Sequence, residues 1–179
     1  MKGSELRLIE YMEGSKKRFI IPVYQRNYDW KIENCKQLYD DLIQVIKNNS
    51  KTHFFGSIVS VYEPSGRNTE FLIIDGQQRL TTMSLLFLAL YNLLEEKIII
   101  SEDESLKDQI YEDFLVDKYQ PQEKRMKLKP IKNDQKAFSK LFNSKDDYIK
   151  DSNLTINYSY FYERIQKQEI TIDELFDAI

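Results

Sequence analysis

One acid, two amides, one arginine and two hydroxyls lie together in the segment 73–82, which reads Ile-Ile-Asp-Gly-Gln-Gln-Arg-Leu-Thr-Thr. The apolar residues before Asp75 indicate a strand, Gly76 indicates a tight turn, and a helix is expected from about Thr81. Backbone N–H groups at a helix start lack intrahelical partners and attract anions. Arg79 could contact a phosphate with two N–H groups, and Asp75 could hold Mg²⁺ or accept a proton. The segment therefore predicts a phosphate site.

A purely structural explanation of this segment is also open. Asp-Gly is a common turn dipeptide, and Thr81 or Thr82 could simply cap the helix that follows. The sequence lacks the Walker pattern G-x-x-x-x-G-K-[ST], so a phosphate site here would not be a Walker loop.

A second group of polar and aromatic residues follows an apolar run and occupies positions 22–30, Pro-Val-Tyr-Gln-Arg-Asn-Tyr-Asp-Trp. If this group packs beside Gln77, Gln78 and Arg79, the two segments form a polar pocket with aromatic walls. The alternative is an aromatic corner of the core with Arg26 stacked on a ring.

The motifs occur in a recognisable order. They are Ile21-Pro22-x-Tyr24-Gln25-Arg26-x-Tyr28-x-Trp30, Phe55-Gly56-Ser57-Ile58-Val59, Ile74-Asp75-Gly76-Gln77-Gln78-Arg79-Leu80-Thr81-Thr82, Asn133-Asp134-x-x-x-Phe138 and Asn157-Tyr158-x-x-Phe161. Over about residues 18–165 the chain resembles the N-terminal GmrS-type domain of GmrSD type IV restriction enzymes and their relatives in phage defence.

The resemblance implies a nucleotide-hydrolysis motif at Asp-Gly-Gln-Gln-Arg, on a fold similar to ParB and sulfiredoxin. The implied module binds and hydrolyses a nucleoside triphosphate with Mg²⁺, and GTP, ATP, UTP and CTP are not distinguished. It would regulate a modification-dependent nuclease that contacts DNA through the full-length protein.

Site roles follow from the motifs and the resemblance together. The catalytic candidates are Asp75, Gln78 and Arg79, and Asp75 is also the candidate Mg²⁺ ligand. The nucleotide-binding candidates are Tyr24, Gln25, Arg26, Gly76, Gln77, Thr81 and Thr82. A rival hypothesis is a ParB-like binding module that senses DNA or nucleotide without turnover, with Tyr24, Tyr28 and Trp30 stacking on bases.

Composition limits the classes of protein that fit. The chain has 179 residues, is 41% hydrophobic and has a net charge of −3, which favours one substantial core over a disordered or strongly basic protein. A single cysteine, Cys35, suits a reducing cytoplasm, and the most apolar stretch is too short to span a membrane. One cysteine and one histidine cannot form a four-ligand zinc site. That histidine, His53, is a possible additional site residue or a surface residue.

The pattern of elements predicts an α+β fold, with a small mixed sheet, packed helices and a ParB/sulfiredoxin-like core followed by a helical extension. We expect the nucleotide-binding core at residues 1–100 and the extension at 101–179. Arg125, Lys127 and Lys129 alternate with apolar residues, which predicts a strand with one basic face, either solvated or following phosphates. Thr171 and Glu174 match a capping box close to the last residue, so we expect the chain to be part of a longer protein whose nuclease domain or subunit lies elsewhere.

Overall fold

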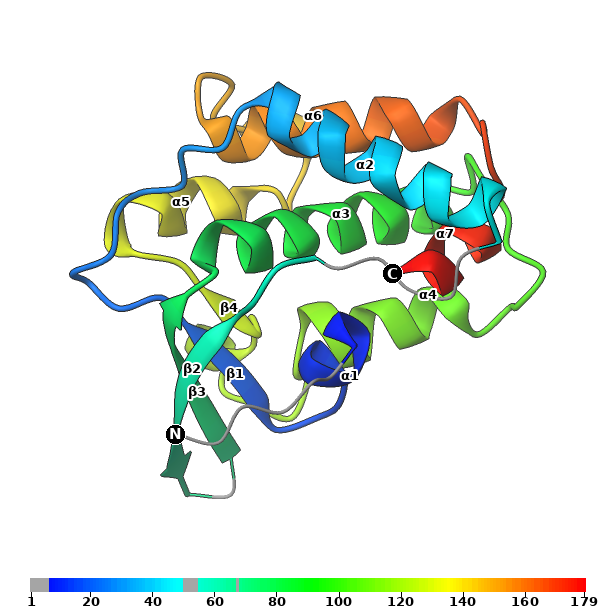
Figure 1. Cartoon of the computed structure of the whole chain (residues 1–179). Helices are drawn as coiled ribbons and strands as arrows, with labels where there is room; N and C mark the ends of the chain where they lie inside the picture. Colours follow the sequence, from blue (N-terminus) through cyan, green and yellow to red (C-terminus); the bar gives the residue numbers. More distant parts are fainter. Residues whose placement is uncertain (1–6, 50–54, 67) are drawn as a thin grey trace.

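The computed structural model describes residues 7–49, 55–66 and 68–179. A sheet occupies one end of the molecule, and a long helix, α3, runs away from it through the middle (Figure 1). Helices α2 and α6 lie along one side of α3, and α4 lies on the other. The architecture is α+β, as predicted.

Within the described residues, four strands form one mixed sheet in the order β2-β3-β1-β4. Strand β1 runs parallel to both β3 and β4, whereas β2 and β3 form an antiparallel hairpin. The strands are β1 (Lys17–Ile20), β2 (Val59–Ser65), β3 (Asn68–Asp75) and β4 (Leu128–Lys129). The hairpin positions the end of β3, at Asp75, directly before α3.

The helices surround the apolar core. They are α1 (Leu8–Met12), α2 (Ile32–Lys47), α3 (Gln77–Glu95), α4 (Leu106–Gln109), α5 (Lys132–Lys140), α6 (Asn153–Gln166) and α7 (Ile172–Ala178). A π-helical segment, η1 (Ile110–Leu115), continues α4, and two single 3₁₀ turns, η2 (Gln122–Lys124) and η3 (Lys145–Asp147), lie in loops. The predicted capping box at Thr171 and Glu174 is confirmed as the start of α7.

Helix α3 is the central element of the core. Every residue from Leu80 to Leu90 is buried, because α6 packs against one side of the helix and η1 against another. The ring of Phe87 stacks on that of Phe114 with centroids 4.3 Å apart. A helix that is apolar on all sides must lie inside the protein, as the sequence predicted.

The structure corrects two predictions about local elements. Helix α3 begins at Gln77, four residues before the predicted start at Thr81, because Gly76 already turns the chain into the helix. The predicted basic strand face is wrong as well. Strand β4 contains only Leu128 and Lys129, and Lys127 is 1% exposed.

Buried carbonyl groups explain the position of Lys127. Its ammonium group donates hydrogen bonds to the carbonyl oxygens of Gly14 and Asp113.

In the part of the chain that the structure describes, no helix is both long enough and apolar enough to span a bilayer.

Candidate functional site

The junction between β3 and α3 is a sharp turn that only glycine can make. Gly76 has φ +88°, in the left-handed region. A Cβ at this position would also lie 3.0 Å from the carbonyl oxygen of Ser57 and 3.0 Å from Ile58 Cγ1. Both the backbone conformation and the close approach of the 57–58 segment therefore require glycine.

The turn leaves a set of backbone donors at the start of α3. The first intrahelical bond runs from Leu80 N to Gly76 O at 3.0 Å. The N–H groups of Gln77, Gln78 and Arg79 precede that bond and have no intrahelical acceptor. Because the helix dipole is positive at this end, the junction is electrostatically suited to an anion.

Arg79 lies across this junction. Its guanidinium donates to Ser57 O at 2.5 Å, and one of its nitrogens is 3.8 Å from the Asp75 carboxylate. A Cβ at Gly56 would lie 3.0 to 3.2 Å from the guanidinium atoms, so the arginine packs directly on the backbone of that glycine. Gly56 and Ser57 thus hold Arg79 beside Asp75. In the sequence, Gly56 and Ser57 were noted only as part of the motifs that carry the family resemblance.

Gln78 connects the start of α3 to the segment 27–30. Its Oε1 accepts hydrogen bonds from the backbone N–H groups of Asp29 at 3.0 Å and Trp30 at 3.4 Å. Its Nε2 donates to the carbonyl oxygen of Asn27 at 3.0 Å. The side chain is buried and both ends of its amide are occupied, which favours a positioning role for Gln78.

A second glutamine holds the other end of the same loop. Gln25 Nε2 donates to the carbonyl oxygen of Ile74 at 2.8 Å, one residue before Asp75. Arg26 lies between the two anchored points and is exposed, 3.3 Å from the Asp29 carboxylate. The predicted proximity of the 22–30 segment to Gln78 is therefore confirmed.

A buried network of hydroxyl and amide groups supports the loop from below. Tyr28 Oη lies 2.7 Å from Thr82 Oγ1 and accepts a hydrogen bond from Asn157 Nδ2 at 2.9 Å. Asn157 also donates to the carbonyl oxygen of Trp30 at 2.8 Å, and the Tyr28 N–H donates to Asp134 at 2.7 Å. Burial raises the pKa of Tyr28 well above its ordinary value, so the phenol stays neutral.

This network gives a structural role to two motifs that sequence reasoning noted only through the resemblance. Asp134, at the start of α5, and Asn157, in α6, both contact Tyr28. The desolvated carboxyl group of Asp134 has a raised pKa. Residues from the C-terminal half of the chain thus help to fix the loop that faces the β3–α3 junction.

The candidate residues fall into two groups by exposure. Asp75 and Tyr24 face solvent, with 67% of the Asp75 side chain and 71% of Tyr24 exposed. Gly76, Gln77, Thr81 and Thr82 are buried. Thr82 donates to the carbonyl oxygen of Gln78 at 2.8 Å, so its position favours an indirect role. His53 lies outside the described residues.

Asp75 is the acidic group at the junction that could serve as a metal ligand. Among the described residues, no three His, Cys, Asp or Glu side chains form a group that could hold a metal by themselves. Mg²⁺ commonly uses one or two carboxylates together with substrate phosphates. The exposed carboxylate of Asp75, beside the open N–H groups of α3, fits that type of ligand.

Comparison with known proteins agrees with this arrangement of motifs. No match was found among curated proteins. The sequence profile of the GmrSD restriction endonuclease N-terminal domain matches residues 8–179, a range that contains the β3–α3 junction, the loop that faces it and the residues that anchor that loop. The chain therefore belongs to the GmrSD restriction endonuclease family and carries its N-terminal domain.

Proposed function

We propose that the β3–α3 junction binds a nucleoside triphosphate and hydrolyses it with Mg²⁺, as the regulatory part of a modification-dependent restriction nuclease. One observation carries this proposal. At the start of α3 the N–H groups of Gln77 to Arg79 lack intrahelical acceptors, and the side chains of Asp75 and Arg79, from the same turn, lie 3.8 Å apart. The likeness of this core to ParB and sulfiredoxin is part of the same proposal.

Binding would depend mainly on positive charge and on backbone donors. The N–H groups at the start of α3 would donate hydrogen bonds to the phosphate oxygens, and Arg79 would neutralise part of the phosphate charge. Arg26 is exposed on a loop that Gln25 and Gln78 hold against the junction, so it is placed to reach the same phosphates. Tyr24, on that loop, presents a ring on which a base could stack.

The hydrolytic step would need a water molecule aligned with the terminal phosphorus. Water would attack the phosphorus, the bond to the leaving oxygen would break, and the water proton would pass to the Asp75 carboxylate or to solvent. The oxygen of the Gln25 amide can accept a hydrogen bond from that water, since its NH₂ group is bonded to Ile74. When bound, Mg²⁺ would neutralise phosphate charge next to Asp75.

A second candidate function is a binding module that senses a nucleotide without turning it over. It is favoured by the fully engaged amide of Gln78, which is not free to orient water. The version of this hypothesis in which Tyr28 stacks on a base does not fit the structure, because Tyr28 is buried and its hydroxyl is held by Thr82 and Asn157.

Turnover distinguishes the two functions. We would measure phosphate release and equilibrium binding for each of the four triphosphates with Mg²⁺, comparing the wild type with Asp75→Asn. The hydrolysis proposal expects the variant to retain nucleotide and lose phosphate release, because asparagine preserves the shape of the turn and removes the anionic group. Glu163→Gln, at an exposed position of α6, is the control and should hydrolyse normally.

Two results would decide against hydrolysis. Nucleotide binding without phosphate release in the wild type would support the sensing module. Normal phosphate release by Asp75→Asn would mean that Asp75 only forms the turn and takes no part in hydrolysis.

A further inference from the structure

A separate cationic pocket lies at the opposite end of β3 from Asp75. It is formed where β1 and β3 begin, with Arg18 opposite Glu70, and is closed by the loop that leads to β4. Strand β3 runs from Asn68 to Asp75, so at about 3.3 Å per residue the two sites are roughly 20 Å apart. The pocket is therefore independent of the proposed nucleotide site.

The size of the pocket limits what it can hold. Its volume is about 60 Å³. Since about 10 to 15 Å³ of the space open to water centres is enough for one water, the pocket has room for a small polyatomic ion.

Positive charge predominates in this pocket. Among the described residues that line it, five are lysine or arginine and two are acidic. One of the acids, Asp117, is already occupied by neutral donors, because it accepts from the backbone N–H groups of Lys16 at 3.3 Å and Tyr119 at 3.1 Å and from Gln120 Nε2 at 3.3 Å. Asp117 keeps its negative charge, but the lysine and arginine side chains of the lining still outnumber its two acids by three.

Arg18 has only weak partners for its charge. Only 14% of its side chain is exposed, yet its contacts with Glu70 and with the carbonyl oxygen of Glu123 are both long, at 3.4 Å. In the part of the chain that the structure describes, its Nε is buried without a hydrogen-bond partner. A guanidinium group that is removed from water normally has stronger partners than these.

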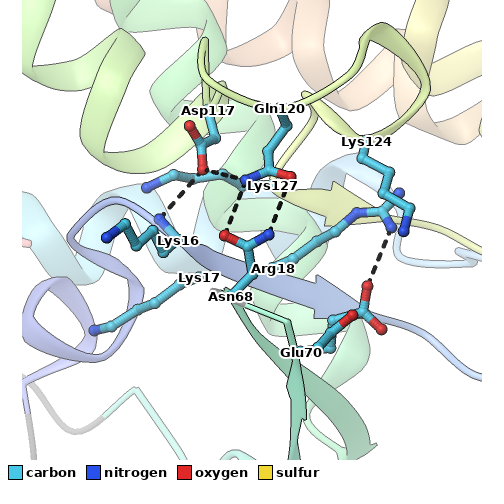
Figure 2. Close-up of a pocket in the computed structure, with 10 residues that line it drawn as sticks. Lys16, Lys17, Arg18, Asn68, Glu70, Asp117, Gln120, Lys124 and Lys127 are labelled. Atoms are coloured by element: carbon cyan, nitrogen blue, oxygen red, sulfur yellow. Dashed lines mark hydrogen bonds and ion pairs between the residues drawn. The ribbon is translucent and has the colours of Figure 1, made fainter.

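Lys124 adds a second cation at the same end of the pocket. It lines the same pocket as Arg18, whose guanidinium donates to the carbonyl oxygen of the preceding residue, Glu123 (Figure 2). Among the described residues, no hydrogen bond or ion pair engages the Lys124 ammonium group. Two cations that line the same small pocket repel each other, and an anion between them would remove that repulsion.

Lys127, which also lines the pocket, is a further cation without an acidic hydrogen-bond partner among the described residues. Its ammonium group is buried and, within the described ranges, its hydrogen bonds go to the carbonyl oxygens of Gly14 and Asp113. Burial lowers the pKa of Lys127 to about 8. An anion in the pocket would oppose this desolvation and favour the charged form of the lysine.

We propose that this pocket binds a single phosphoryl-type oxyanion between Arg18 and Lys124. Arginine and lysine together are the usual partners of such groups, the first through paired N–H donors and the second as a point charge. The ion would be inorganic phosphate, or the phosphate of a small monoester whose organic part extends into solvent. Binding of this ion does not depend on the proposed triphosphatase activity.

Calorimetric titration of the whole chain with inorganic phosphate, with chloride used to keep ionic strength constant, tests the proposal. Lys124→Gln should weaken binding about tenfold, as expected for the loss of one charge-assisted contact. Since Lys124 is exposed and makes no internal bond, this variant should fold normally. Lys36→Gln, on an exposed position of α2, is the matched control and should bind like the wild type.

Two further titrations locate the site and identify the source of the phosphate. Arg79→Ala should leave this binding unchanged, because Arg79 belongs to the other end of β3. Methyl phosphate binding as tightly as inorganic phosphate would indicate a monoester, whereas a clear preference for inorganic phosphate would indicate the free ion. Unchanged affinity in Lys124→Gln, loss of binding in Arg79→Ala, or no binding of either probe at millimolar concentration would overturn the proposal.

Discussion

The side chain of Gln78 donates a hydrogen bond to the carbonyl oxygen of Asn27 at 3.0 Å and so joins the first turn of α3 to a loop 51 residues earlier in the chain. The same amide accepts from the backbone N–H of Asp29. One residue of the Asp-Gly-Gln-Gln-Arg motif therefore holds the loop that carries Gln25 and Arg26. The motif builds its own surroundings as well as presenting an acid and an arginine.

Replacing Gln78 with methionine should release this loop. The change preserves side-chain length and leaves two N–H groups and one carbonyl group without their partner, which should lower the free energy of unfolding by about 2 kcal/mol. Hydrogen exchange should quicken at the amide of Asp29 and stay slow in the core of α3, at Leu85. Gln166→Met, at an exposed position, is the control. Equal exchange at Asp29 in both variants would mean that Gln78 does not hold the loop.

Gly76 and Gly66 offer a test of why the junction needs glycine. Both have positive φ, but a Cβ at Gly66 would meet nothing within 4 Å, whereas one at Gly76 would press on Ser57 and Ile58. Gly66→Ala should cost about 1 to 2 kcal/mol for the left-handed backbone alone. Gly76→Ala should cost more, by about 1 to 3 kcal/mol, because it adds overpacking. Chemical denaturation measures both, and equal losses would exclude a steric role for the 57–58 segment.

Lys127 should make stability rise with pH. Its pKa is about 8 in the folded chain against 10.5 for the ordinary side chain, so the unfolded chain binds more protons between these values. The free energy of unfolding therefore increases as pH rises. The contribution of Lys127 to this increase between pH 7 and 9 is on the order of 1 kcal/mol. Cys35 acts in the opposite direction above its ordinary pKa of 9.0, because burial raises its pKa to about 12.

The Lys127 contribution is isolated by comparison with Lys127→Met in phosphate-free buffer. Subtracting the two unfolding free energies at each pH removes the effect of Cys35, which both proteins share. The free energy of unfolding of the wild type minus that of Lys127→Met should increase as pH rises from 7 to 9. A difference that stays constant over this range would show that Lys127 keeps its ordinary pKa.

The sequence predicted the elements that have strong local signals. The α+β class and the strand before Asp75 follow from the period of apolar residues and from turn chemistry. The start of α3 was misplaced because the usual signal is a hydroxyl or acidic cap, which pointed to Thr81, whereas a left-handed glycine begins this helix.

Long-range hydrogen bonds explain what the sequence did not predict. The hydrogen-bond partners of the Gln78 and Asn157 side chains lie at least 48 residues away along the chain, so no local pattern indicates them. Lys127 was misassigned for a related reason. Alternation with apolar residues predicts an exposed lysine, but the carbonyl groups of Gly14 and Asp113 hold this one inside.

Nucleotide-dependent thermal stabilisation of Arg79→Ala tests the central claim most directly. Each variant is compared with its own melting temperature without ligand, since Arg79 also bonds to Ser57 and its loss lowers stability by itself. Circular dichroism confirms that the fold is retained, and Lys36→Ala serves as the control. A triphosphate with Mg²⁺ should raise the melting temperature of the wild type and of the control, because a ligand that binds only the folded state stabilises it. The rise should disappear in Arg79→Ala, whose affinity should fall by at least about tenfold. An equal rise in Arg79→Ala would contradict the assignment of the phosphate site to the β3–α3 junction.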